Sequence, residues 1–297
     1  MMTGNVQTRP NDYLPVLAVL GAVFLWGSSF SAMRVVLQDL DPLGVMFCRL
    51  LTAFICLIPF IPRLIPKGYQ KGDWKILLPM VLFQPCLYFL CESNALTYTT
   101  SSQAGIIAST MPLMVAVGAW MFLSEKITLV TVAGLLLTIA GVVALTLFQS
   151  DDTVAANPIL GNLLELGAMA SASANTILVK RLTSRYSPWT LTAMQVVTGI
   201  LFFSPGLAGI LNAPSSVWSL KLIILLVFLG SCVSLGAFAL YNWGISRIDA
   251  SRASIFINLV PVTAIFLGWL VLGEVLNLNQ CVAAAVVIFG VLISNRK

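Results

Sequence analysis

Residues 102–142 read SQAGIIASTMPLMVAVGAWMFLSEKITLVTVAGLLLTIAGV, and residues 251–291 read SRASIFINLVPVTAIFLGWLVLGEVLNLNQCVAAAVVIFGV. The two stretches align without a gap at a separation of 149 residues, and the matched positions include a proline, a glutamate and a glycine: Pro112/Pro261, Glu125/Glu274 and Gly141/Gly290. Each copy predicts an apolar helix with a central proline, a short turn that carries the glutamate, and a second apolar helix. The chain therefore contains a duplicated membrane unit.

The composition excludes a water-soluble domain. Of the 297 residues, 59% are hydrophobic and only 9% are charged, and the mean hydropathy is +0.96. These values predict an all-α polytopic membrane protein. Histidine is absent, and the six cysteines lie in apolar runs without metal-type spacing, so we expect no metal and no cofactor. No phosphate-binding, zinc-protease or hydrolase motif is present, and we expect no enzyme activity and no nucleic-acid partner.

Apolar segments of roughly 20 residues, the length that a bilayer requires, predict ten transmembrane helices. They lie near 15–36, 43–62, 74–94, 101–122, 128–148, 158–180, 188–208, 219–244, 251–271 and 277–294. The first 12 residues lack a basic stretch leading into a cleavable signal, so we expect the first segment to be retained as a helix.

The distribution of positive charge predicts the orientation. With the N-terminus in the cytoplasm, all basic residues except Arg34, Arg49 and Lys221 fall on cytoplasmic loops and tails. The positive-inside rule therefore places both termini in the cytoplasm. This bias also explains the net charge of +5.

The repeat extends upstream at a separation of 146 residues, with Gly21 over Gly167, Pro42 over Pro188 and Thr52 over Thr198. Each copy then has five helices, which gives predicted units at 13–148 and 158–295. Because five is odd, the second unit enters the membrane in the opposite sense. Inverted repeats are typical of secondary transporters, in which the substrate lies between the halves.

Short motifs along the whole chain resemble the EamA-type members of the drug/metabolite transporter superfamily. The motifs are WGSSF at 26–30, ALTYT at 95–99, SEK at 124–126 and Arg49 after the Pro42 turn, together with Pro112, Gly141, Pro261 and Gly273-Glu274. The second half departs from the ALTYT pattern and reads GISRI at 244–248. The resemblance implies a ten-helix fold with a central cavity and export of metabolites or amino acids across the bacterial inner membrane.

We therefore expect a secondary transporter that exports small metabolites, above all amino acids, by alternating access through a central cavity. Its expected partners are the small-molecule substrate and the lipid bilayer, and a monomer would suffice. The alternative is efflux of hydrophobic cationic drugs. A membrane enzyme would need convergent acidic, histidine or cysteine side chains, which the sequence does not offer.

Pro112 and Pro261 are predicted to interrupt two helices at the same depth in both halves. A proline removes a backbone donor and weakens a helix locally. Matched interrupted helices indicate the transport path, so we predict that both prolines act as hinges; inherited packing kinks are the alternative.

One helix carries a polar face formed by Gln84, Tyr88 and Glu92, which recur every four residues. Lipid offers no hydrogen-bond partners, so this face is predicted to form a cavity wall. The alternative places Glu92 at the outer interface.

Glu165 lies about seven residues inside an apolar helix and counts as a candidate functional residue, since a buried carboxylate is costly. Arg49 enters its own helix to a similar depth. We predict a gating or structural ion pair between these two residues. The alternative is that Glu165 binds a substrate amino group or a coupling proton while Arg49 steers a carboxylate; proton coupling would use Glu92 or Glu165, and facilitated diffusion would need neither.

The remaining predicted cavity residues are aromatic or carry small polar groups suited to an amphiphilic metabolite: Trp26, Asn94, Ser109, Asn175, Tyr241 and Asn258. Trp120 and Trp269 are assigned to the interfacial aromatic belt.

Overall fold

The structure is a computed structural model that describes residues 13–60, 69–123, 128–148, 156–248 and 256–294. In these ranges all regular structure is helical, and no strand occurs. The first half contains α1 (Leu14–Val36), α2 (Pro42–Leu57), η1 (Ile58–Phe60), α4 (Trp74–Val81), η2 (Leu82–Leu87), α5 (Tyr88–Tyr98), α6 (Ser101–Ala108), α7 (Met111–Leu123) and α8 (Leu129–Leu147). The second half contains α9 (Pro158–Leu182), α10 (Pro188–Phe203), α11 (Gly206–Asn212), η3 (Ser215–Val217), α12 (Leu220–Val227), η4 (Phe228–Ala237), α13 (Phe238–Ile245), η5 (Phe256–Leu259), α15 (Val260–Leu272) and α16 (Leu278–Ser294).

Two helices, α2 and α9, begin where a capping residue precedes a proline. The side chains of Asp41 and Asn157 accept hydrogen bonds from backbone N–H groups in the first turns of α2 and α9, and Pro42 and Pro158 follow directly. A capping oxygen satisfies an otherwise unbonded N–H group, and a proline in the first turn has no N–H group to satisfy. These dipeptides therefore fix where the chain enters a helix after a turn.

Each predicted segment contains helix, and four helical runs have the length and hydropathy of a membrane span: Leu14–Val36, Pro42–Phe60, Trp74–Tyr98 and Leu220–Ile245. A fifth is formed if α10 and α11, which are bent by 63° at Ser204–Pro205, count as one span. The segment predicted at 188–208 is therefore bent near its end, and the short helix α11 extends past it to Asn212. The chain is thus an all-helical membrane protein, and the count of ten spans stays a prediction.

The predicted proline interruptions are present, but each proline lies at the start of a helix and not in its middle. α6 ends at Ala108 and α7 begins at Met111, one residue before Pro112. In the second half, a 3-10 turn precedes α15, and Pro261 lies in the first turn of that helix. Because proline suits the first turn of a helix, the chain breaks just before each proline.

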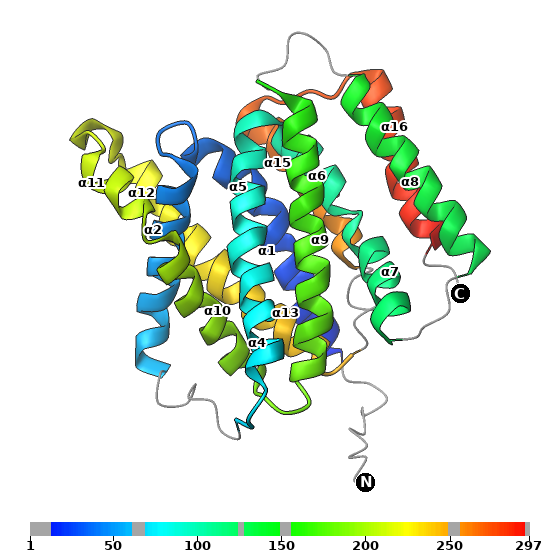
Figure 1. Cartoon of the computed structure of the whole chain (residues 1–297). Helices are drawn as coiled ribbons and strands as arrows, with labels where there is room; N and C mark the ends of the chain where they lie inside the picture. The colour runs from blue at the N-terminus through cyan, green and yellow to red at the C-terminus, as the bar shows by residue number, and fades with distance from the viewer. Residues whose placement is uncertain (1–12, 61–68, 124–127, 149–155, 249–255, 295–297) are drawn as a thin grey trace.

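The α8 and α16 helices pack along each other at the edge of the bundle (Figure 1). Their contact is reciprocal, since Gly141 lies against Val287 and Gly290 lies against Thr138. A methyl group at either glycine would come within 2.8 Å of the facing helix. The absence of a side chain at these matched positions therefore lets the two backbones approach closely.

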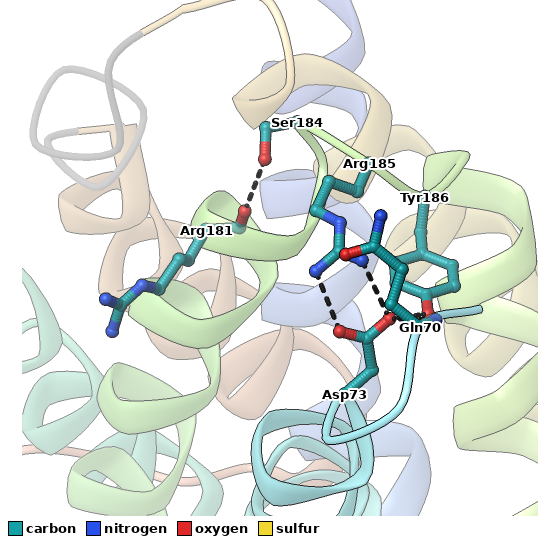
Figure 2. A network of polar contacts seen from close by, with 6 residues as sticks. All are labelled: Gln70, Asp73, Arg181, Ser184, Arg185 and Tyr186. Atoms are coloured by element: carbon teal, nitrogen blue, oxygen red, sulfur yellow. Dashed lines mark hydrogen bonds and ion pairs between the residues drawn. The ribbon is translucent and has the colours of Figure 1, made fainter. Parts of the chain in front are cut away.

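At one end of the bundle, Asp73 joins the start of α4 to the α9–α10 turn (Figure 2). Its carboxylate forms a bidentate ion pair with Arg185, with N–O distances of 2.7 and 3.0 Å. The same carboxylate accepts from the Tyr186 hydroxyl at 2.6 Å and from the Gln70 N–H group at 2.9 Å. We call this end of the bundle, which is at the bottom of Figure 1, the Asp73 end.

At the opposite end, Glu274 joins the end of α15 to the start of α6. Gly273 adopts a left-handed conformation with φ of 67°, which ends α15 and turns the chain toward α6. The Glu274 carboxylate accepts from the backbone N–H groups of Ser101 and Ser102, each at 2.9 Å, and from both serine hydroxyls. Contacts between the two halves of the chain thus close both ends of the bundle.

Replacing Asp73 with asparagine is predicted to destabilise the fold in a pH-dependent manner. Hydrogen bonds from Tyr186 and Gln70 and the guanidinium of Arg185 hold the pKa of Asp73 below its usual range. The carboxylate therefore stabilises the folded state fully above the unfolded pKa of about 3.9, and this stabilisation is lost as the pH falls through the lower folded pKa. Thermal unfolding of the purified protein in detergent should show a lower midpoint for D73N than for the wild-type protein at pH 6. The two midpoints should become equal as the pH falls below the folded pKa of Asp73.

Asp39→Asn is the matched control, because Asp39 is exposed in the turn after α1. D39N should unfold like the wild-type protein at pH 6. Equal midpoints for D73N and D39N at that pH would contradict a stabilising role for the Asp73–Arg185 pair.

Candidate functional site

A narrow central cavity of about 30 Å³ lies between α1, η2, α5, α9 and α13. Its lining includes four residues that the sequence analysis singled out: Trp26, Gln84, Tyr88 and Tyr241. The Trp26 ring lies 4.9 Å from the Tyr241 ring and 5.4 Å from the Phe238 ring, between centroids. These rings form an aromatic wall from both halves of the chain.

Both helix breaks border this cavity. Ala108 and Met111 line it at the first break, and Ile257 and Val260 line it at the second. A break in a helix leaves backbone groups without helical partners, and within a membrane such groups are tolerated only where protein or a water-filled cavity surrounds them. The structure thus places the two predicted interruptions beside the site.

Ser109 and Asn258, which occupy equivalent repeat positions, lie at these breaks. The Ser109 hydroxyl donates to the carbonyl of Ile106 at 2.6 Å. The Asn258 side chain forms no hydrogen bond with any residue that the structure describes, although its nitrogen and oxygen are both buried. Asn258 therefore offers an unused donor and an unused acceptor next to the cavity.

A charged layer lies on the Glu274 side of the cavity. Arg49 of α2 is 1% exposed, and its Nη1 lies 3.8 Å from Glu92 Oε2 of α5. Its Nε donates to the Ser234 hydroxyl at 2.5 Å, and its guanidinium lies 4.4 Å from the centre of the Phe89 ring. Tyr88 donates a hydrogen bond to the second oxygen of Glu92. The buried cation is thereby held by partners from two other helical segments, α5 and η4.

The ion pair of Arg49 therefore differs from the expected one. The sequence predicts Arg49–Glu165, because the two residues enter their helices to similar depths. In the structure Arg49 pairs with Glu92. The Glu165 side chain is fully buried, and both of its carboxyl oxygens lack a hydrogen-bond partner among the described residues. Depth along a helix does not specify the direction in which a side chain points, so the neighbour of Arg49 could not be identified in this way.

An amide layer lies on the Asp73 side of the cavity. The Asn175 side chain donates to Gln84 at 2.7 Å, and the Gln195 side chain donates to Asn175 at 3.1 Å and to the Gln84 carbonyl at 3.2 Å. Asn242 continues the layer by donating to Gln195 at 3.3 Å and to Thr192 at 2.9 Å. This network joins η2 of the first half to α9, α10 and α13 of the second.

The sequence analysis identified Gln84 and Asn175 in this layer but missed Gln195, Asn242 and Thr192. The available signal was the occurrence of isolated amides in apolar helices, which have to find partners inside the protein. Each of these residues is an isolated polar position in its own helix, so no repeating polar face in the sequence links it to the others.

Asn94 does not reach the cavity. Its side chain donates to the Leu90 carbonyl of the same helix at 2.7 Å. Trp120 and Trp269 are 51% and 57% exposed, so their rings face the outside of the bundle. No group of three or more histidine, cysteine, aspartate or glutamate side chains that could hold a metal occurs among the described residues.

Comparisons with known proteins identify the family of this chain. Residues 14–147 and 159–296 both match the EamA-like transporter family. The uncharacterized transporter YetK of Bacillus subtilis (strain 168) is 26% identical over 97% of this chain and 88% of its own length. The uncharacterized transporter YcxC of the same strain is 27% identical over 92% of this chain and 89% of its own.

Two further matches extend the comparison. The WAT1-related protein At3g02690, chloroplastic, of Arabidopsis thaliana is 26% identical over 99% of this chain and 72% of its own length. A protein of known crystal structure shares the fold with a TM-score of 0.64 at 19% identity, over 94% of this chain and 95% of the other. The chain belongs to the EamA-like transporter family, whose members are multi-pass membrane transporters of small molecules.

Proposed function

We propose that this protein is a secondary transporter that exports small metabolites, above all amino acids, across the bacterial inner membrane. The observation that carries the proposal is a cavity lined by both helix breaks and bounded by a charged layer and an amide layer. An aromatic wall can contact an apolar side chain, while the polar layers can bind the ends of a zwitterion.

The proposed architecture is ten spans in two inverted five-helix repeats, 13–148 and 158–295. Three features support it. Gly290 lies 149 residues after Gly141, and Val287 lies 149 residues after Thr138. The contact of Gly141 with Val287 is therefore repeated by the contact of Gly290 with Thr138, as a two-fold axis between the halves requires. A shift of 149 residues moves η2 to 231–236, inside the π-helical segment η4. The breaks before Pro112 and Pro261 are likewise equivalent.

The proposed orientation places the Asp73 end in the cytoplasm, together with both termini. Lys180, Arg181, Arg185 and Arg247 lie at this end, whereas the Asp39 turn and Lys221 lie at the other. A concentration of basic residues on one side is the usual signal for the cytoplasmic side.

Alternating access would require the two end contacts to open in turn. The Asp73–Arg185 pair would hold the cytoplasmic end, and the Glu274 contact with Ser101 and Ser102 would hold the outer end. Both contacts join the first half to the second, so each of them resists a relative movement of the halves. A closed stage of this proposed cycle is supported by the two formed contacts and by the small volume of the cavity, about 30 Å³.

Glu165 is the proposed site for the substrate ammonium. It is fully buried and has no hydrogen-bond partner among the described residues, whereas Glu92 is occupied by Arg49 and Tyr88. A buried carboxylate without a partner is costly, and a cationic ligand would remove that cost. The same feature supports the second candidate function, efflux of a hydrophobic cationic drug, with the aromatic wall contacting its apolar part.

Glu165→Gln is predicted to reduce transport without reducing stability. Loss of a charged hydrogen bond to the ammonium should weaken apparent substrate affinity roughly 10- to 100-fold. Purified protein in liposomes, supplied with labelled amino acids or cationic dyes with and without a proton gradient, gives this measurement. The midpoint of thermal unfolding should stay equal or rise for E165Q, because no partner is lost.

Glu92→Gln is the matched comparison, since it removes the partner of buried Arg49 and should lower the unfolding midpoint. If E165Q transports every substrate at the wild-type rate at all pH values, Glu165 neither binds the substrate nor couples transport to protons. Dye flux without amino-acid flux in the wild-type protein would favour drug efflux.

Replacing Pro112 or Pro261 with alanine is predicted to slow transport. Alanine allows the helix to continue through the break and stiffens the proposed hinge. The maximal rate should fall roughly tenfold, which corresponds to about 1.4 kcal/mol, with little change in KM. Pro214→Ala between α11 and η3 is the control. Full transport rates in both P112A and P261A would rule out the hinge.

A further inference from the structure

A second, larger cavity opens beside α9. It is an apolar groove of about 640 Å³ between α4, α7 and α9. On α9, Met169, Ala172 and Thr176 face the central cavity, whereas Ala170 and Ala174 face this groove. The Ser173 hydroxyl donates to the Met111 carbonyl at 3.2 Å, where α7 meets α9 between the two spaces. The groove is therefore distinct from the proposed substrate site.

Small residues give the groove its depth. Ala170 and Ala174 on α9 and Gly118 on α7 leave space between helices that larger side chains would fill. A methyl group at Gly118 would lie only 2.6 Å from the Ile177 side chain. The walls are almost entirely apolar, and Arg181 is the one charged residue among the described residues that line them.

The length of the groove matches one leaflet of a bilayer. From Ala170 to Arg181, α9 rises by about 16 Å at 1.5 Å per residue. The hydrocarbon region of a bilayer is about 30 Å thick, so this distance is about half of it. Arg181 lies at the Asp73 end of the groove, one residue before α9 ends at Leu182. The groove thus begins near mid-membrane and ends in a cation at the membrane surface.

The guanidinium of Arg181 is available at this surface. Figure 2 shows that its side chain points away from the Asp73–Arg185 pair. Arg181 is exposed, and its side chain forms no hydrogen bond or ion pair with any residue that the structure describes. Its neighbour Lys180 is used differently, since its ammonium donates to the carbonyls of Ile245 and Ile248.

We propose that this groove binds an anionic phospholipid of the cytoplasmic leaflet. One acyl chain lies along the apolar walls, and the phosphate accepts hydrogen bonds from Arg181. An apolar channel of one-leaflet length with a cation at its surface end matches a lipid, whose charge and chain are arranged in the same order. A partner transmembrane helix, about 10 Å wide and spanning both leaflets, would not match a groove confined to one half.

Lipid binding can be measured on the full-length protein without transport. Purified protein in maltoside micelles is mixed with phosphatidylglycerol or with phosphatidylcholine of the same acyl chains, and bound lipid is counted by native mass spectrometry. The wild-type protein should retain phosphatidylglycerol more tightly. Arg181→Gln should weaken phosphatidylglycerol binding about fivefold, the effect of one arginine near a membrane surface. Ala170→Phe should reduce retention of both lipids, because its ring fills the groove.

Two matched variants control for the substitutions. Arg247→Gln removes an exposed arginine whose guanidinium lies 4.0 Å from the centre of the Trp243 ring. Ala208→Phe enlarges an exposed alanine on α11. Both should bind lipid like the wild-type protein. Ala174→Leu replaces A170F if that variant does not fold.

The proposal is overturned if R181Q retains phosphatidylglycerol like the wild-type protein, or if neither groove-filling variant loses lipid. A dimer mass that the groove-filling variant removes would also overturn it, since a second copy would then occupy the groove. The measurement requires neither flux nor a membrane orientation, so its failure is distinguishable from failure of the proposed transport function.

Discussion

Arg49 shows the constraint on which the rest of the structure depends. A cation inside a membrane protein has to be paired, because lipid cannot hydrate it. Arg49 is nearly inaccessible to solvent, and Glu92, Ser234 and the Phe89 ring surround it. These partners come from α5 and η4, so satisfying one charge on α2 ties both halves of the chain together. The amides follow the same rule, since Gln84, Asn175 and Gln195 bond mainly to one another.

The interrupted helices obey this constraint in a different way. The backbone N–H and C=O groups inside a helix bond to one another, and a break leaves the groups of about one turn without these partners. In this protein both breaks border the central cavity, where backbone groups are shielded from lipid. Two buried polar groups, the Asn258 amide and the Glu165 carboxyl, have no hydrogen-bond partner among the described residues, although neither lines the cavity. Burying such groups without a partner costs free energy in the ligand-free protein, and a ligand that pairs with them would remove that cost.

Hydropathy predicted an all-helical membrane protein, and every predicted segment contains helix in the structure. It succeeded because the bilayer fixes the length of a span. The division of the helices into two five-helix repeats stays a prediction. The partner of Arg49 was mispredicted because distance along a helix does not report rotation about its axis. Asn242 and Gln195 were missed because hydrogen bonds between distant helices leave no periodic pattern in a sequence.

The aromatic wall has an electrical consequence. Trp26, Phe238 and Tyr241 lie between the charged layer and the amide layer, and the remaining free space of about 30 Å³ is enough for roughly two water molecules. Two waters cannot form a continuous file from one polar layer through the bundle to the other side. In this structure the cavity therefore offers protons and small ions no continuous path of water between the two polar layers. A cell could keep many copies of such a protein in its membrane without dissipating its membrane potential.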